Sequence, residues 1–220
     1  MKFKTLTASL VITICAASSP ASSASVRVVD GDTLEVSGTR HRLHGIDAPE
    51  AGQSCAKKGG GEWACGKAAI AAMEDLVSAG PVECEGQGKD GYDRTISICR
   101  VDGRDISRGM IELGMAWAFV KYSRDYEAEE AEARRQGKGV WQALTETPWD
   151  YRSKKWDVAM QEAPDGCPIK GNISKQGMIY HAPWSPWYRK TKVTLKDGER
   201  WFCSEDEAIE AGWRAPIWGR

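Results

Sequence analysis

Two short acidic stretches hold the residues whose types and spacing could do chemistry. Asp30-Gly31-Asp32-Thr33 places two carboxylates at a tight glycine turn. The stretch Arg42 to Glu50 then brings an arginine and two more carboxylates, Asp47 and Glu50, to the end of a strand. Pro49 stops this strand because proline cannot donate to a β-ladder. Four acids and an arginine on two turns cost free energy unless a cation or a phosphate group lies between them.

These residue types suit the hydrolysis of a phosphodiester bond. Negative charge on the phosphoryl oxygens requires arginines that clamp them, and we assign Arg42 and Arg94. A carboxylate must align and deprotonate a water, and we assign Glu50. A hard divalent cation is held by oxygen ligands, which Asp32 and Asp47 supply. Taken singly, each residue is more typical of a solvated or capping side chain at a turn than of a catalytic one.

The elements that position these residues follow from the periodicity of the sequence. Strand patterns occur over residues 26–29, 33–36, 40–46, 82–85 and 95–101, with a short extended piece at 116–120. Helical spacing occurs over residues 66–79, 105–113 and 126–136. Five strands with a helix between the third and fourth is the order of an OB-type barrel. We therefore predict an α+β fold, a five-stranded OB-fold barrel with three helices.

Composition divides the chain into four parts. Residues 1–24 carry two lysines, an apolar run and a small-residue cleavage signal, which predicts a secretory signal peptide and a secreted or periplasmic protein. Residues 25–148 form the predicted main domain and residues 149–165 a linker with few periodic apolar residues. Residues 166–220 form a small C-terminal β/α module. Seven of the ten tryptophans lie from Trp149 onward, which marks the change in composition.

Six cysteines follow the predicted signal peptide, and an even number in an exported chain indicates disulfides. Six cysteines allow 15 pairings. We expect Cys55–Cys65 to close a glycine-rich loop, Cys84–Cys99 to join two strands, and Cys167–Cys203 to tie the C-terminal module. No two cysteines have C-x-x-C spacing, which argues against zinc.

Charge argues against strong non-specific binding to polyanions by the main domain. Residues 25–150 hold 16 Lys and Arg against 22 Asp and Glu, a net charge of −6, while residues 151–220 have a net charge of +3. Non-specific affinity for nucleic acid comes from Lys and Arg that release counterions. Any phosphate chemistry is therefore expected to be local and assisted by a cation.

The motifs in residues 26 to about 150 resemble the thermonuclease (staphylococcal nuclease-like) family. The resemblance rests on Val29 to Thr33, Arg42 to Glu50, Tyr92-Asp93-Arg94 and Leu113 to Trp117. It implies an OB-fold enzyme that uses calcium to cleave DNA and RNA by attack of water on phosphorus.

Position by position, the resemblance implies the following roles. Arg42, Glu50 and Arg94 match the catalytic residues, and Asp32 and Asp47 match the calcium carboxylates. Ala48 matches a position whose backbone carbonyl binds calcium, and Tyr92 and Tyr122 match tyrosines of the nucleotide pocket. Asp93 stands where the family usually has glycine.

Two alternatives to a secreted monomeric nuclease remain open. Some domains of this family only bind nucleic acid, and some members carry exopolysaccharide-biosynthesis names, which leaves an envelope accessory protein as a second alternative. The C-terminal module resembles small Trp- and Tyr-rich domains of other bacterial proteins through Lys170 to Ser174 and Phe202 to Arg214. Its aromatic residues could stack on a single strand or form its core, and we favour the core.

Overall fold

One sheet carries both acidic stretches in the computed structural model, which describes residues 25–90 and 94–216. Its strand order is β1-β2-β3-β8-β7, with β9 paired to β8. Strand β3 runs parallel to β8, and the other neighbours are antiparallel. The strands are β1 (Val26–Asp30), β2 (Thr33–Val36), β3 (Thr39–Leu43), β7 (Val82–Lys89), β8 (Thr95–Val101) and β9 (Arg104–Asp105). The predicted strands at 26–29, 33–36, 82–85 and 95–101 are therefore confirmed.

The strand predicted over residues 40–46 is divided in the structure. Strand β3 ends at Leu43, the chain turns, and β4 (Ile46–Asp47) pairs with β10 (Trp117–Ala118) instead of continuing in the main sheet. The register places Trp117 opposite Asp47. This division takes Asp47 out of the main sheet and places it beside Arg42. The alternation of apolar residues alone does not indicate such a division.

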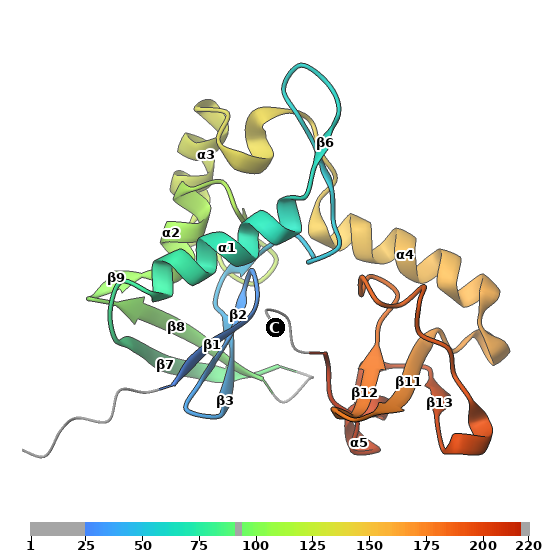
Figure 1. Ribbon diagram of the computed structural model, residues 1–220. Helices are drawn as coiled ribbons and strands as arrows, with labels where there is room; N and C mark the ends of the chain where they lie inside the picture. The colour runs from blue at the N-terminus through green and yellow to red at the C-terminus, as the bar shows by residue number, and fades with distance from the viewer. Residues whose placement is uncertain (1–24, 91–93, 217–220) are drawn as a thin grey trace, which may run out of the picture.

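The three predicted helices are confirmed as α1 (Cys65–Val77), α2 (Ile106–Glu112) and α3 (Glu127–Arg135). Asp105 caps α2 as expected, because its side chain accepts a hydrogen bond from the backbone N–H of Arg108 at 3.2 Å. Helix α1 packs against β1 and lies beside α2 (Figure 1). Short 3-10 helices occupy Gly139–Gln142, Pro164–Gly166 and Leu195–Asp197.

The segment predicted as a linker is helical over most of its length. Helix α4 (Pro148–Glu162) is capped by Thr147, whose side chain accepts a hydrogen bond from the backbone N–H of Asp150. Pro148 is its first residue, a position where proline is well tolerated. Only Pro148 and Ala159 are buried in this helix. Its apolar residues face two different neighbours, so they do not form the single stripe by which a helix is recognised in sequence.

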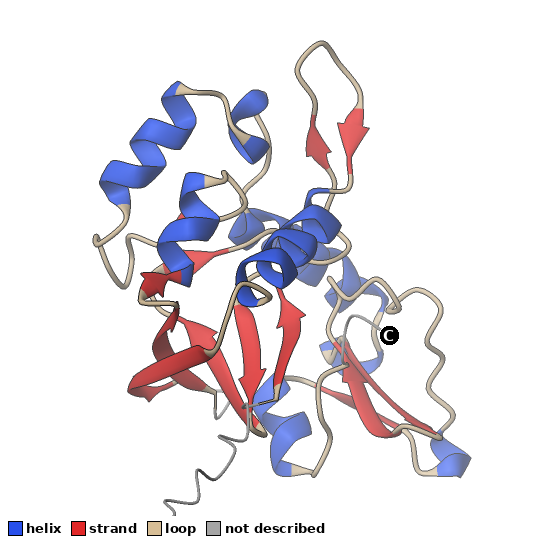
Figure 2. Ribbon diagram, turned by 60° about the vertical axis from the view of Figure 1, so that its left-hand side comes forward, coloured by secondary structure: helices blue, strands red, loops and turns tan. Residues whose placement is uncertain are grey.

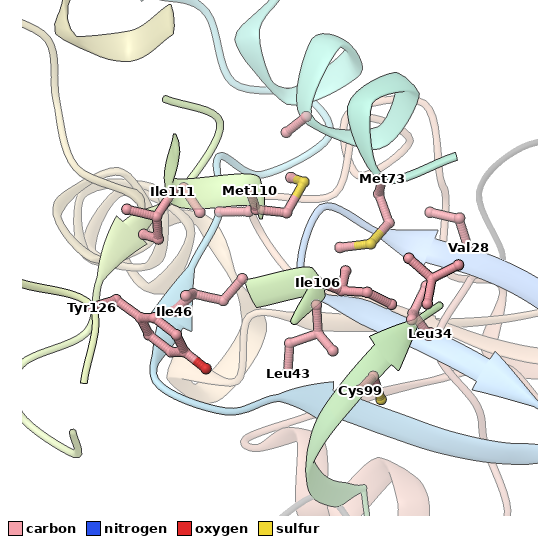
Figure 3. Packing of buried hydrophobic residues seen from close by; sticks show 14 of the residues in the cluster. Val28, Leu34, Leu43, Ile46, Met73, Cys99, Ile106, Met110, Ile111 and Tyr126 are labelled. Atoms are coloured by element: carbon pink, nitrogen blue, oxygen red, sulfur yellow. The ribbon is translucent and has the colours of Figure 1, made fainter. Parts of the chain in front are cut away.

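The core of the main domain fills the space between the sheet and helices α1 and α2. Leu34 and Leu43 from the sheet meet Met73 from α1 and Ile106 and Met110 from α2, and all five side chains are almost fully buried (Figure 3). Burial of such side chains contributes about 1.5–3 kcal/mol each. This core fixes the ends of β1, β2 and β3, where the acidic stretches begin.

The C-terminal module has its own sheet and core. Its sheet has the order β12-β11-β13 and lies apart from the main sheet (Figure 2). The core contains Ile169, Tyr180, Phe202, Ala208 and Trp213, and Trp156 of helix α4 packs against it. The elements are β11 (Ile169–Ser174), β12 (Gly177–His181), β13 (Arg200–Phe202) and α5 (Glu205–Glu210).

The three expected disulfides are present: Cys55–Cys65, Cys84–Cys99 and Cys167–Cys203. The first closes the loop that carries a hairpin of β5 (Cys55–Ala56) and β6 (Glu62–Trp63). Among the described residues, no helix has the length and apolar character to cross a membrane. The predicted signal peptide, residues 1–24, lies outside the described residues.

Candidate active site

Arg42 lies between two of the predicted acids. Its Nη1 is 2.9 Å from Oδ2 of Asp32, and its Nη2 is 3.1 Å from Oδ1 of Asp47. Asp47 is fully buried and Asp32 is 7% exposed. Because charges that are removed from water need partners, the guanidinium stabilises both carboxylates in their ionised form. The structure thus brings together three residues that the sequence predicts.

The glycine turn holds Asp32 against the second acidic stretch. The backbone N–H of Ala48 donates to Oδ2 of Asp32 at 3.0 Å, and the N–H of Asp32 donates to Oδ1 of Asp30 at 3.1 Å. A Cβ on Gly31 would lie 2.7 Å from the Cβ of Ala48. Only glycine allows this approach, so Gly31 brings the two stretches into contact.

The backbone of Glu50 is fixed by the loop that follows it. Gln53, which is 1% exposed, accepts a hydrogen bond from the Glu50 N–H at 3.1 Å and donates its own N–H to the Glu50 carbonyl at 2.7 Å. A Cβ on Gly66, in the first turn of α1, would overlap that carbonyl oxygen. Glu50 therefore projects from a rigid corner, and sequence reasoning did not include Gln53.

A third arginine, which the sequence analysis missed, enters the site from helix α4. Nη2 of Arg152 is 2.7 Å from Oδ2 of Asp47, and its Nη1 is 2.7 Å from Oε1 of Glu50 and 3.2 Å from Oδ1 of Asp47. Arg152 thus binds one carboxylate with both nitrogens and joins it to the other. Asp47 and Glu50 are paired with an arginine that lies about a hundred residues further along the chain.

Arg94 immediately precedes β8, and its Nε donates to Oδ2 of Asp90 at 2.7 Å. Burial acts to lower the pKa of Arg94, but the charges of Asp90, Asp32 and Asp30 raise it above its usual value. The charges of the acidic turn therefore act on this guanidinium. The role of Arg94 as a second phosphate clamp stays a prediction. Tyr92 and Asp93 lie outside the described residues.

Tyr122 follows the short strand β10 and is 71% exposed. Its ring meets that of Phe119 edge-on at 5.0 Å, and Phe119 stacks on Trp149 of helix α4 at 5.6 Å. These exposed and stacked rings form an aromatic surface next to the strand that pairs with Asp47. The role of Tyr122 in substrate binding stays a prediction.

Comparison with known proteins gives two family matches. The family model described as "Staphylococcal nuclease homologue" matches residues 40–143. An "Uncharacterized endonuclease" of Escherichia coli O157:H7 is 33% identical over 138 residues, which cover 59% of this chain and 84% of that protein. The chain belongs to the staphylococcal nuclease homologue family. A second model, described as "ArfC", matches residues 154–215.

Other relatives of this family carry different names. A "Micrococcal nuclease" of Shigella flexneri is 32% identical over 145 residues, 58% of this chain and 78% of that protein. The "Succinoglycan biosynthesis protein ExoI" of Rhizobium meliloti (strain 1021) is 38% identical over 125 residues, 54% of this chain and 64% of that protein. The staphylococcal nuclease match ends before Arg152, so helix α4 supplies this arginine from outside the matched region.

The carboxylates of this nuclease-family site differ in their electrostatics. Burial acts to raise the pKa of Asp32, but Arg42 and the hydrogen bond from Ala48 hold it below its usual value. Burial raises the pKa of Glu50 to about 7, against the opposing charge of Arg152. A carboxylate with a lowered pKa suits a cation ligand, and one with a pKa near neutrality suits a general base. Burial raises the pKa of Asp47, the second proposed cation ligand, against the charges of Arg42 and Arg152.

The donor set of the site fits a hard divalent cation. Asp32 and Asp47 offer buried carboxylate oxygens, which calcium and magnesium prefer over nitrogen or sulfur ligands. In the part of the chain that the structure describes, however, their oxygens and those of Glu50 do not gather as three within 4.8 Å of one another. The group that does so is His41 with Cys84 and Cys99, and the two cysteines form a disulfide.

Proposed function

We propose that this protein is a calcium-dependent nuclease that hydrolyses phosphodiester bonds of DNA and RNA by attack of water on phosphorus. The observation that carries the proposal is the convergence of Arg42, Asp32, Asp47 and Glu50 on one site, with the charge of Asp32 acting on Arg94 as well. The names of the Shigella and Escherichia relatives support this activity.

Each residue has a separate role in the proposed reaction. Arg42 and Arg94 bind the phosphoryl oxygens, on which negative charge increases as the water attacks. Glu50 accepts the proton of that water, and Gln53 holds the Glu50 backbone in place. Asp32, Asp47 and the Ala48 carbonyl would hold calcium, which supplies positive charge to neutralise the phosphate. Tyr92 and Tyr122 are the proposed contacts to the nucleotide.

The proposal is tested by hydrolysis of single-stranded DNA with calcium and with a chelator. We expect activity only with calcium, and Glu50→Gln should lower kcat by about 10²-fold or more, since it removes the general base. Glu62→Gln, in the exposed hairpin of β5 and β6, is the matched control and should leave kcat unchanged.

Three results would contradict the proposal in different ways. Full activity in chelator would remove the role of calcium, and unchanged activity of Glu50→Gln would remove the general base. Binding of DNA without turnover in calcium would favour the alternative, a nuclease-fold protein that binds nucleic acid or assists an envelope or exopolysaccharide process without catalysis.

We further propose that the protein is exported and works as a monomer with four parts: signal peptide 1–24, nuclease domain 25–148, connecting segment 149–165 and C-terminal module 166–220. Three disulfides support export, because disulfides persist in oxidising compartments such as the periplasm and the extracellular space. Amino-terminal sequencing of the mature protein would test the cleavage site after Ala24.

A further inference from the structure

Arg152 contacts the carboxylate oxygens of Asp47, the proposed metal ligand, and of Glu50, the proposed general base. It contacts both oxygens of Asp47, and Arg42 adds a further contact to one of them. Arg152 also contacts Oε1 of Glu50 at 2.7 Å. The Asp47 side chain is fully buried, while that of Arg152 is 26% exposed. The guanidinium therefore replaces solvent as the partner of a buried carboxylate, and it can leave towards the surface.

A divalent cation and this guanidinium compete for the same carboxylates. Two positive charges on the same carboxylate oxygens repel each other, and the burial of Asp47 weakens the screening of this repulsion by water. The oxygens of Asp32, Asp47 and Glu50 are also held apart instead of gathering as three within 4.8 Å, among the residues that the structure describes. The arrangement is thus one in which arginines, rather than a metal ion, balance the acids.

Helix α4, which carries Arg152, is attached on both sides of it. Towards the nuclease domain, the hydroxyl of Tyr151 donates to the Gly52 carbonyl at 3.3 Å, close to Glu50. Towards the module, Trp156 lies 6.1 Å from Trp184 and packs against the module core. Glu205, at the start of α5, accepts a hydrogen bond from the Tyr180 hydroxyl at 2.8 Å. Burial raises the pKa of Glu205, while this hydrogen bond and the charges of Arg94 and Arg152 act to lower it.

We propose that Arg152 is a resident counter-cation of the active site, which a divalent metal ion displaces from Asp47 and Glu50 when it binds. This inference rests on the proposed function for the position of the metal site. Metal occupancy is then coupled to helix α4 and through it to the C-terminal module. Arg152 acts as a positioning residue, because it holds the two acids in place until the metal ion takes over their charge.

The inference predicts opposite effects of one substitution on stability and on metal affinity. In calorimetric titrations of the mature chain with calcium chloride, Arg152→Gln should bind calcium about tenfold more tightly than the wild type, because the competing charge is gone. Without metal, the same variant should have a lower Tm, because Glu50 loses its arginine and Asp47 keeps only Arg42. A residue with a merely structural role would weaken both properties together.

Two further variants separate charge from geometry. Arg152→Lys keeps the positive charge and should bind calcium nearly as weakly as the wild type. Lys155→Gln removes one charge from an exposed position of the same helix and should change neither calcium affinity nor Tm. If Arg152→Gln does not fold, the wild type still provides a test, because calcium should shift the Nε–Hε nuclear magnetic resonance signal of Arg152, assigned with Arg152→Lys.

The outcomes distinguish this inference from the proposed function. Equal or weaker calcium binding by Arg152→Gln, or an Arg152 signal that calcium leaves unchanged, would overturn the inference while calcium-dependent hydrolysis of DNA still stood. Absence of calcium binding by the wild type and all variants would overturn the inference together with the metal assignment. Calcium binding without hydrolysis of DNA would contradict only the proposed activity.

Discussion

The amide of Gln53 makes a hydrogen bond at each end. Its oxygen accepts from the Glu50 N–H at 3.1 Å, and its nitrogen donates to the Glu146 carbonyl at 2.9 Å. The side chain is almost completely buried, so neither backbone group has water as a ready substitute partner. At the scale of single residues, Gln53 joins the corner that carries Glu50 to the chain just before helix α4.

We predict that Gln53→Ala destabilises the protein and slows catalysis, although the general base Glu50 itself is unchanged. Loss of the amide leaves two buried backbone groups without partners and a cavity, which should cost about 1–3 kcal/mol of unfolding free energy. Urea unfolding measures this loss, and kcat on single-stranded DNA should fall because Glu50 is no longer fixed. Gln136→Ala, at the exposed end of α3, is the control. Unfolding free energy and kcat both equal to those of this control would contradict the role of Gln53.

The residues that could be predicted are those whose partners lie nearby in sequence or that the resemblance supplies. Arg42, Asp47 and Glu50 lie within nine positions, so their nearness follows from short spacing even though Arg42 is on β3 and Asp47 is on β4. Arg152 stands 102 positions from Glu50 on a helix with many other charges, and nothing in its surroundings marks it. Long-range ion pairs of this kind depend on the tertiary fold, which residue spacing does not determine.

One disulfide joins the two ends of the β5–β6 hairpin in the loop between Glu50 and helix α1. Cys55 and Cys65 are buried, 10 positions apart, and Cys65 is the first residue of α1. The backbone N–H of Gly66 donates to the Gln53 carbonyl at 3.2 Å, immediately after this disulfide. At the scale of elements, the crosslink therefore fixes the start of α1 relative to the loop that positions Glu50.

We predict that Cys55→Ser with Cys65→Ser lowers the unfolding free energy by about 3 kcal/mol, the loop entropy that such a crosslink removes from the unfolded chain. It should also lower kcat, because the Glu50 loop becomes mobile. The matched control is Cys167→Ser with Cys203→Ser, which opens the disulfide of the C-terminal module. This control should lose comparable stability in urea and keep its kcat. Equal kcat in both double variants would contradict the prediction that the Cys55–Cys65 disulfide positions the Glu50 loop.

The periodicity of apolar residues identified helices that bury one face, but it did not identify helix α4, which packs against two different parts of the molecule. Helix α1 presents Ala69 and Met73 to one core, so its spacing predicts it within two residues. Helix α4 directs Trp149 to the nuclease domain and Trp156 to the module, and its capping residue Thr147 lies before a proline. The sequence of α4 therefore resembles a polar connection, although its backbone is helical.

At the scale of the whole molecule, helix α4 belongs to two hydrophobic clusters at once. Trp149 packs with Trp117 and Val140 in the cluster that includes the Cys55–Cys65 disulfide. Trp156, two turns further on, packs against the core of the C-terminal module. A helix that packs against both clusters transmits the unfolding of one part to the other, since each cluster includes one of its tryptophans. The nuclease domain and the module should therefore unfold together.

We predict one coincident unfolding transition in urea when tryptophan fluorescence and far-ultraviolet circular dichroism are followed in parallel. Trp156→Ala should divide it into two transitions, with the module unfolding at lower urea by about 2 kcal/mol, because a partly buried indole is lost from its core. Val158→Ala, on the exposed side of the same helix, should leave a single transition within about 0.5 kcal/mol of the wild type. Two separate transitions in the wild type itself would show that α4 does not join the two cores. A division seen only in Trp156→Ala would identify this tryptophan as the contact through which the module and the nuclease domain share their stability.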